Sequence, residues 1–232
     1  MPEPDVLYED NHLIIINKRP GDIVQGDRTG DMPLSETVKA YLKHKYNKPG
    51  NVFLGVVHRL DRPVSGAVIF AKTSKALRRL NEMLRRHEIK KTYLALVEGR
   101  PESHEGTYID YLKKNPKTNK TTVFKRPTEG AKKAILHYVM RKIGDHYSLL
   151  EIDLKTGRHH QIRAQLAKHG TPVKGDLKYG ARRSNPSGGI MLHAARLGFI
   201  HPVKKTPVQI IASFPEGYGW EIIEKLKNCP GK

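Results

Sequence analysis

Two short apolar segments enclose the most unusual stretch of this sequence. The first runs from Val52 to Val57 and the second from Ala67 to Ala71, and both are rich in β-branched and aromatic residues. Short runs of this composition are typical of buried strands. Between them lies the charged sequence His58-Arg59-Leu60-Asp61-Arg62, followed by Pro63 and the turn pair Ser65-Gly66. The chain therefore has to fold so that a charged loop is held between two buried strands.

Asp61 is the one acidic residue of this loop. Positive charge on both sides favours the ionised carboxylate, and an ionised carboxylate can act as a nucleophile. The alternative interpretation is a surface loop in which an Asp-Arg pair closes a turn. Composition alone favours that alternative, so the decision depends on the rest of the chain.

The whole chain is strongly basic. Its 232 residues include 42 Lys and Arg against 23 Asp and Glu, which gives a net charge of +19. Solubility does not need so many charges of one sign, so this excess predicts a polyanionic partner, with RNA or DNA ahead of a membrane surface. The segment from Lys113 to Arg126 has six basic residues and no acidic one. We expect it to contact an RNA backbone as a hairpin or loop, although a disordered insert would have the same composition.

The remaining segments predict alternating strands and helices. Apolar residues at helical spacing predict helices over 33–46 and 75–87, with Thr73-Ser74 as the N-cap of the second, and Trp220 to Leu226 predicts a closing helix. Short β-branched runs predict strands near residues 6–8, 13–17, 92–99, 134–140, 147–154 and 208–212. With 38% hydrophobic and 28% charged residues, this is a globular chain with enough length for one sizeable core.

Several classes of site and location are not expected. The single cysteine, Cys229, allows neither a disulfide within the chain nor a cysteine-based zinc site. There is no HExxH pair and no glycine-rich phosphate loop after a strand, so we expect no metal and no cofactor. The apolar run from Leu13 to Ile16 is too short for a signal core or a membrane span. We therefore expect a cytoplasmic protein that does not contact a membrane, and a monomer.

Four segments together resemble the motifs of the RluA-type pseudouridine synthases. The first is His58-Arg59-Leu60-Asp61 with Ser65-Gly66, and the second, from Lys91 to Val97, is similar to Lys-x-Tyr-x-Ala-x-Val. The most specific runs from Lys155 to Leu166 and is similar to Thr-Gly-Arg-x-His-Gln-Ile-Arg-x-x-Leu. In it we expect Thr156 to cap a helix whose buried face holds Ile162 and Leu166. The fourth, from Leu192 to Pro202, is similar to Leu-His-Ala-x-x-Leu-x-Phe-x-His-Pro.

The resemblance implies that the chain isomerises uridine to pseudouridine in ribosomal or transfer RNA, without a metal or a cofactor. It implies that Asp61 is the nucleophile on a flipped-out uridine, that Arg163 pairs with this aspartate, and that Tyr93 stacks on the base. Arg59 would fill the gap that the flipped base leaves. Other motif residues that we expect to contact RNA are His58, Arg62, Arg158, Gln161, Ile162 and Leu197. Two positions depart from the family pattern, since Val64 replaces a threonine and Gln165 a common histidine.

The resemblance also implies the fold: a mixed α/β (α+β) architecture with a largely antiparallel sheet flanked by helices. The matches run from about residue 7 to 214, so we expect one catalytic domain over residues 1–232. Many members of the family carry a small RNA-binding domain in front, and we expect it to be absent here.

Two other functions stay open. One is a catalytically inactive RNA-binding module on the same fold, which explains the charge but not why Asp61, Tyr93 and Arg163 occur together. The other is different carboxylate chemistry, as in a nucleoside hydrolase or a nuclease. A two-carboxylate glycosidase needs a second acid and a metal nuclease needs an acidic cluster, and the sequence around Asp61 offers neither. EDTA would stop such a nuclease but not a pseudouridine synthase.

Overall fold

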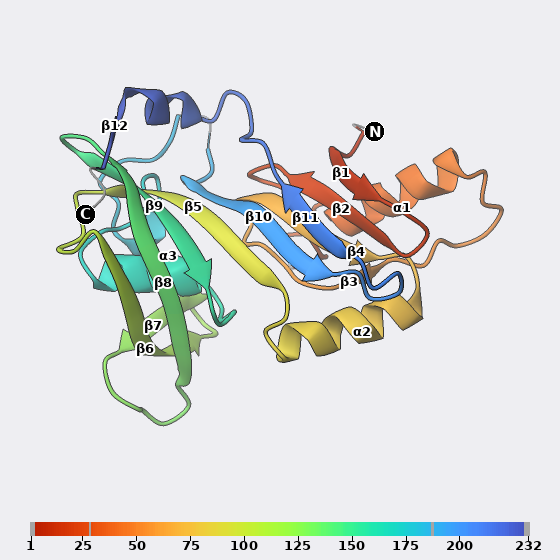
Figure 1. Ribbon diagram of the computed structural model, residues 1–232, viewed down its shortest axis with the longest axis horizontal. Coiled ribbons are helices and arrows are strands. Elements are labelled where there is room, and N and C mark those ends of the chain that lie inside the picture. Colours follow the sequence, from red (N-terminus) through yellow and green to blue (C-terminus); the bar gives the residue numbers. More distant parts are fainter. Residues whose placement is uncertain (1–2, 28, 187, 230–232) are drawn as a thin grey trace. The chain divides into compact units, whose positions relative to one another are not determined.

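The computed structural model describes residues 3–27, 29–186 and 188–229, and Figure 1 labels their helices and strands. Arg28 lies in the polar segment 25–32 and Ser187 in the basic segment 182–189, both of which the sequence predicts as loops, and these two residues lie outside the described residues. The chain divides into two compact units. Unit 1 contains residues 1–90 and 194–215, and unit 2 contains residues 91–193 and 216–232. The single catalytic domain over residues 1–232 stays a prediction.

The strands of unit 1 form its core. Their order is β1 (Val6–Glu9), β2 (Leu13–Lys18), β4 (Ser65–Ala71) and β10 (Leu192–Ile200), with β3 (Gly55–Val56) paired to β4 and β11 (Pro207–Ile211) paired to β10. The pairs β1–β2, β2–β4, β3–β4 and β10–β11 are antiparallel. In the β2–β4 pair, Leu13 lies opposite Ala71 and Lys18 opposite Gly66. Every residue of both strands is buried, as their apolar composition predicts. The apolar run 52–57 is a strand only at its two residues of β3.

Two α-helices of unit 1 lie close to their predicted positions. α1 spans Leu34–Lys45 and α2 spans Ser74–Arg85. The Thr73 hydroxyl accepts a hydrogen bond from the Ala76 N–H at 3.2 Å, which confirms the predicted cap. α2 lies beside β3 and β4 and buries Ala76 and Leu80 (Figure 1). These two side chains complete an apolar cluster with alternate strand residues, which include Leu13, Ile15, Ala67, Ile69, Leu197, Phe199, Val208 and Ile210.

Gly66 brings the start of β4 very close to β10. Its φ is +114°, and a Cβ at this position would lie 2.4 Å from the carbonyl oxygen of Ala194. A residue with a side chain cannot occupy this position without moving the backbone. Ser65 and Gly66 are not the predicted turn pair but the first two residues of β4, and Gly66 fixes where the charged loop rejoins the buried strands.

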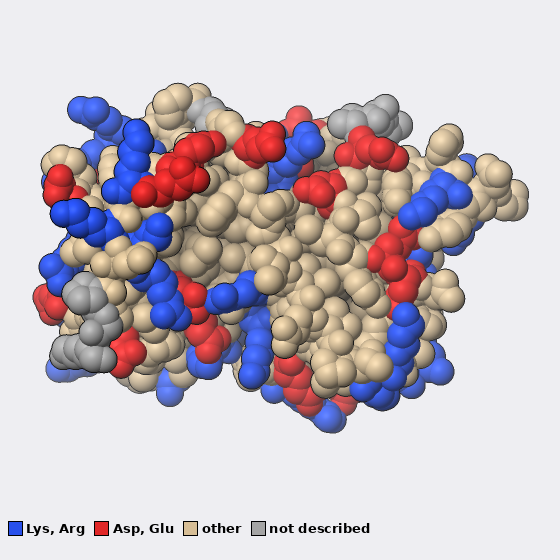
Figure 2. Space-filling view, turned by 45° about the horizontal axis from the view of Figure 1, so that its top comes forward, with Lys and Arg blue, Asp and Glu red and all other residues tan. Residues whose placement is uncertain are grey.

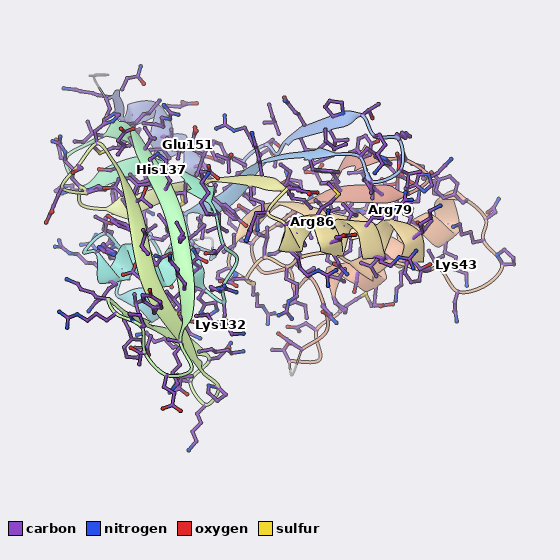
Figure 3. The ribbon with its side chains drawn as sticks, turned by 60° about the horizontal axis from the view of Figure 1, so that its bottom comes forward. Lys43, Arg79, Arg86, Lys132, His137 and Glu151 are labelled. Carbon is purple, nitrogen blue, oxygen red and sulfur yellow. The ribbon has the colours of Figure 1, made fainter. Side chains whose placement is uncertain are left out.

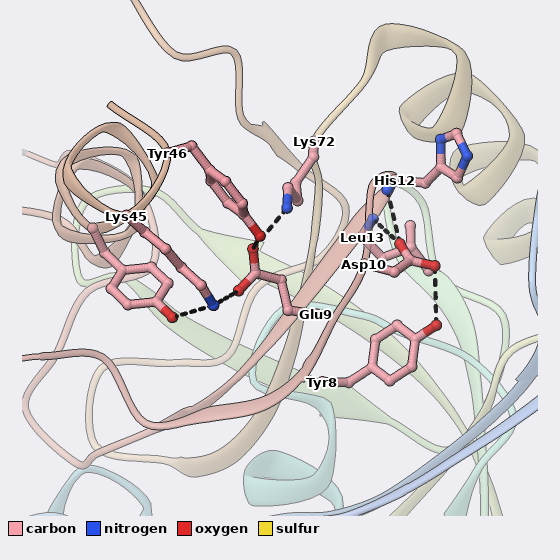
Figure 4. A network of polar contacts seen from close by, with 9 residues as sticks. Tyr8, Glu9, Asp10, His12, Leu13, Lys45, Tyr46 and Lys72 are labelled. Atoms are coloured by element: carbon pink, nitrogen blue, oxygen red, sulfur yellow. Dashed lines mark hydrogen bonds and ion pairs between the residues drawn. The ribbon is translucent and has the colours of Figure 1, made fainter. Parts of the chain in front are cut away.

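Glu9 joins three elements of unit 1 (Figure 4). Its carboxylate accepts hydrogen bonds of 2.7 Å each from Lys45, which ends α1, from Tyr46 and from Lys72, which follows β4. The side chains of Glu9 and Lys72 are each 8% exposed. Burial by itself raises the pKa of Glu9, but the three donors outweigh it and lower the pKa to about 2. This ionised carboxylate holds α1 and the end of β4 against β1.

Unit 2 is built on two long hairpins. Its strand order is β5 (Lys90–Glu98), β9 (Tyr147–Leu154), β8 (Lys132–Ile143), β6 (Glu105–Asn115) and β7 (Lys120–Phe124), with β12 (Lys227–Asn228) paired to β8. Each neighbouring pair in this order is antiparallel. The β8–β9 hairpin is where the sequence predicts it, and the basic segment 113–126 is largely the β6–β7 hairpin. Both units thus confirm a mixed α+β fold with largely antiparallel strands.

The third α-helix, α3 (Gln161–Lys168), begins later than predicted. Thr156 is not its cap: the hydroxyl oxygen accepts from the Ile135 N–H at 2.8 Å and the hydroxyl donates to Gln161 Oε1 at 2.8 Å. His160 precedes the helix in the left-handed conformation, with φ of +49°. Thr156 therefore ties the loop to β8. The buried helix face is confirmed, since Ile162 and Leu166 are both in the interior.

The remaining helical turns are short. η1 (Leu177–Tyr179) follows α3, and the predicted C-terminal helix is a 3-10 helix, η2 (Trp220–Lys225). None of the helices in the described ranges is both long and apolar enough to cross a lipid bilayer.

Candidate active site

In unit 1, the loop between β3 and β4 carries Asp61 between two fixed points. Before it, the His58 imidazole accepts a hydrogen bond from the Ile69 N–H of β4 at 3.2 Å. After it, the Asp61 carbonyl accepts from the Val64 N–H at 3.0 Å and closes a turn. The Asp61 side chain itself is half-buried. The loop is thus anchored to β4 before Asp61 and closed by a turn after it, and this fixes the backbone from which the half-buried carboxylate extends.

The two arginines of this loop differ in their contacts. Arg62 donates from Nε to the Gly21 carbonyl at 3.1 Å and forms an ion pair with Asp31. Its carbonyl accepts from the Gly21 N–H at 2.9 Å. Arg59 is exposed and has no hydrogen-bond or ion-pair partner within the described parts of the chain. Arg62 therefore fastens the loop to the segment after β2, and Arg59 is the better placed of the two for a ligand.

Lys18 is the residue of this region that the sequence left without a role. It is 1% exposed, and its Nζ donates to the carbonyl oxygens of Arg19 at 2.8 Å and Arg62 at 3.0 Å. Burial lowers the pKa of Lys18 to about 7, against the carboxylates of Asp22 and Asp61, which raise it. The signal in the sequence was a lysine directly after the apolar run Leu13–Ile16 and Asn17.

In unit 2, Arg163 of α3 is held by Asp176. Arg163 Nε donates to Asp176 Oδ2 at 2.6 Å and Nη2 donates to Oδ1 at 2.9 Å, and the two side chains are 6% and 2% exposed. The guanidinium carbon lies 5.1 Å from the centre of the Tyr179 ring. A bidentate pair fixes the guanidinium plane as well as its position. Asp176 and Tyr179 belong to a Gly-Asp-x-x-Tyr-Gly segment, which signals this loop but not its contact with Arg163.

Tyr179 is itself fixed by hydrogen bonds. Its hydroxyl accepts from the Thr121 N–H of β7 at 2.8 Å and lies 2.9 Å from His160 Nδ1. Burial, and after it the positive charge of Arg163, lower the pKa of His160 to about 2. His160 is therefore neutral at physiological pH. The Arg163 guanidinium is thus enclosed by residues from the start of α3, from η1 and from β7.

Four other predicted site residues are buried. Tyr93 lies on β5 opposite Ile152 of β9. Gln161 uses its whole amide: Oε1 accepts from Thr156 and from the Arg158 N–H at 3.0 Å, and Nε2 donates to the Ile135 carbonyl at 3.1 Å. Ile162 of unit 2 and Leu197 of unit 1 pack in the interior. These contacts explain their burial, and contact with RNA stays a prediction.

Unit 2 also has a basic groove of about 400 Å³. Arg158 is exposed there and its Nε donates to the Lys133 carbonyl at 3.0 Å. Lys132 lies at the start of β8, where Figure 3 shows it. No acidic side chain contributes to the lining, which consists of Leu112, Lys113, Lys114, Thr121, Gly130, Lys132, Gly157, Arg158 and His159. On the face that Figure 2 shows, by contrast, Lys and Arg are spread among acidic residues rather than gathered in one place.

Within the described ranges, no three His, Cys, Asp or Glu side chains gather as a metal site.

Comparisons with known proteins identify relatives along the whole chain. The family model described as RNA pseudouridylate synthase matches residues 12–168. Ribosomal large subunit pseudouridine synthase D of Xylella fastidiosa is 34% identical over 225 residues, covering 91% of this chain and 66% of its own length. Ribosomal large subunit pseudouridine synthase C of Escherichia coli is 34% identical over 232 residues, covering 97% and 70%. This chain thus spans about two thirds of the length of these relatives.

A solved structure supports the fold. Human RNA pseudouridylate synthase domain containing 4 superposes with a TM-score of 0.81 at 20% identity, covering 98% of this chain and 95% of the human chain.

Proposed function

This chain belongs to the RNA pseudouridylate synthase family, and on that premise we propose that Asp61 is the nucleophile with which it isomerises uridine to pseudouridine in RNA. The predicted family, fold class and class of enzyme are confirmed by the relatives and by the fold. The observation that carries the role of Asp61 is its placement. It is a half-buried carboxylate in a loop anchored before and after it, with the buried Lys18 ammonium close enough to be affected by its charge.

The reaction needs a nucleophile and a uracil base that is held in place, and little else. The bond from uracil N1 to ribose C1′ breaks, the ring turns, and a bond from C5 to C1′ forms. C5 loses a proton and N1 gains one, so substrate and product have the same composition. A carboxylate that attacks and later leaves can serve this exchange without an added oxidant or reductant. The target base has to leave its stack to reach the carboxylate.

Arg163 and Tyr93 are the proposed partners of Asp61. An arginine held by two short hydrogen bonds in a buried setting keeps its charge and its orientation. Such a group is suited to stabilise a carboxylate once a bound base has excluded water. Tyr93 is proposed to stack on the uracil ring. Arg59, exposed in the Asp61 loop, is proposed to fill the gap that the flipped base leaves.

Ribosomal RNA is the proposed substrate, with transfer RNA as the alternative. Both relatives described above are named for the ribosomal large subunit. The basic groove of unit 2 offers four Lys and Arg side chains and no carboxylate, which suits a phosphodiester backbone. A monomer in the cytoplasm, where such RNA is modified, is part of the same proposal.

The test is a pseudouridine map of unmodified ribosomal and transfer RNA transcripts. Wild type, Asp61→Asn and Asp145→Asn are incubated with each transcript, in parallel reactions with and without EDTA and without added cofactor. New sites are located by carbodiimide-stop sequencing. Asp145 is an exposed carboxylate in the β8–β9 turn, so its variant makes the same charge change outside the proposed site. We expect identical sites from wild type and Asp145→Asn and none from Asp61→Asn.

Three results would contradict the proposal. Sites made by Asp61→Asn would remove this residue as the nucleophile. Salt-sensitive RNA binding by wild type without any new site on either class of RNA would favour the binding module. Activity that EDTA abolishes would indicate a metal-dependent reaction instead.

A further inference from the structure

We propose that Lys91 and Gly157 of unit 2 form a binding site for one phosphate of the RNA backbone, next to the uridine that is isomerised. The inference deepens the proposed function and rests on it, because it takes Tyr93 as the residue that stacks on the base. It gives a role to Lys91, a residue of the second motif segment that has none in the reaction described above.

Lys91 lies on the same face of β5 as Tyr93. The two residues are two positions apart in this strand, and side chains alternate between the two faces of a strand. Their Cα atoms are therefore roughly 7 Å apart along the strand. A base and the phosphates of its nucleotide are connected through a single ribose. A charged side chain beside the tyrosine that stacks on the base is thus within reach of the phosphates on either side of the uridine.

The Lys91 ammonium group lies beside Gly157, in the loop between β9 and α3. A Cβ at Gly157 would lie 3.5 Å from Lys91 Nζ and would meet no other group within 4 Å. Because glycine has no side chain, the space next to the ammonium group is open to a ligand. Gly157 also lines the basic groove of unit 2. The ammonium group therefore lies at the edge of the surface that is proposed to bind the RNA backbone.

Neither of the two groups has a partner in the described ranges. Lys91 Nζ forms no hydrogen bond or ion pair there, and the Gly157 N–H donates no hydrogen bond. Burial lowers the pKa of Lys91, and no described carboxylate offsets this effect. Lys174, also half-buried in unit 2, differs: it donates to Asn185 Oδ1 at 2.6 Å, and Glu98 partly offsets the effect of burial on its pKa. A bound phosphate would give the Lys91 ammonium group the anionic partner that it lacks.

The loop around Gly157 is fixed before the ligand binds. The Thr156 N–H donates to the Ile135 carbonyl at 3.2 Å, and the Arg158 N–H donates to Gln161 Oε1 at 3.0 Å. Both neighbours of Gly157 are therefore held by hydrogen bonds, while its own N–H remains available. Lysine side chains and backbone N–H groups are both common ligands of phosphate oxygens. The site thus combines one charged and one neutral donor on a fixed backbone.

The test removes the charge from either side of this contact. The substrate is a short RNA stem-loop that contains a site found in the pseudouridine map. The phosphate before or after the target uridine is replaced, one at a time, by an uncharged methylphosphonate. We expect one of the two replacements to lower kcat/KM of the wild type on the order of 10- to 100-fold, which is the effect of one hydrogen bond to a charged group.

The variant Lys91→Met should show that loss with unmodified RNA. With the methylphosphonate that affects the wild type, its kcat/KM should fall less than about twofold further, because the contact is already absent. Lys91→Arg keeps the charge and should recover part of the loss.

Lys90→Met is the matched control. Lys90 is the neighbouring residue of β5 and is exposed, and its side chain belongs to the other face of the strand. Its substitution removes the same charge from the protein. Any loss that it causes should multiply with the loss from the methylphosphonate, since the two groups do not touch.

Three results would overturn the role of Lys91. They are wild-type kcat/KM in Lys91→Met, losses from Lys91→Met and from each methylphosphonate that multiply, and a wild type that neither replacement affects. The last result needs no variant, so the test stays decisive if Lys91→Met does not fold. Pseudouridine made by Asp61→Asn, or a map without any site, would instead overturn the proposed function.

Discussion

Removal of the Asp176 carboxylate should destabilise unit 2 strongly. Asp176 and Arg163 form a bidentate ion pair with side chains that are 2% and 6% exposed, so solvent screens it little. Breaking a buried pair on one side typically raises the free energy of the folded state by about 3–5 kcal/mol, because the other charge loses its partner without regaining water. A domain is commonly stable by only about 5–15 kcal/mol. Asp176→Ala should therefore remove a large part of the available stability.

Urea unfolding followed by circular dichroism measures this loss. The control is Asp153→Ala, which breaks the Lys155–Asp153 pair at the end of β9 in the same unit. Its side chains are 55% and 44% exposed, and an exposed pair contributes only about 0–1 kcal/mol. Asp176→Ala together with Arg163→Met removes both charges of this pair and should recover part of the stability, since replacing a buried ion pair by apolar groups costs less than breaking it on one side.

The refuting result is specific. If the free energy of unfolding of Asp176→Ala lies within about 1 kcal/mol of that of Asp153→Ala, the buried pair does not hold Arg163 as the distances indicate. Asp176→Asn tests the functional consequence at nearly constant volume. It should lower the rate constant more than it weakens RNA binding, since the guanidinium keeps its charge but loses part of its orientation.

Two further predictions follow from the charges. The pKa of Glu9 falls from 4.5 to about 2 in the folded protein. Its ionised carboxylate therefore adds about 3 kcal/mol to the free energy of unfolding, and this contribution is complete above pH 4.5 and is lost as the pH falls toward 2. Glu9→Gln should lose that stability at neutral pH and have a flatter stability profile over this acidic range, which urea unfolding measures; an unchanged profile would contradict the network in Figure 4. Lys132→Ala with Arg158→Ala should weaken RNA binding and reduce the slope of log K against log salt by roughly 0.7–0.9 for each phosphate that is no longer neutralised. The control is the double variant Lys39→Ala with Lys43→Ala on α1. If both double variants change RNA affinity and the salt slope equally, the groove has no specific role.

Helices and strands could be predicted from the sequence where their own side chains determine where they begin and which face is buried. α2 begins at a threonine that caps it, and its apolar residues face the strands at helical spacing. The β8–β9 hairpin and the fully buried strands β2 and β4 follow from their apolar runs. These features depend on neighbours within a few residues, which is why the sequence indicates them.

Elements whose bounds depend on distant partners were less predictable. Thr156 is a good helix cap by type, but it bonds Ile135 of β8 instead, 21 residues away in the chain. α3 consequently begins at Gln161, after His160 adopts a left-handed conformation. The apolar run 52–57 lies mostly outside regular strands, because only Gly55 and Val56 pair with β4.

The sequence by itself determined the family, the kind of reaction and the charged residues proposed to carry it, because motifs of this spacing and a net charge of +19 are properties of residue order and composition. Only the tertiary structure decided which contacts hold those residues. Lys18 and Arg62 are 44 positions apart, and Arg163 and Asp176 are 13 apart with the end of a helix between them. A buried charged group cannot be solvated by water, so it pairs with the nearest group of suitable chemistry. Which group is nearest depends on how the strands and helices pack.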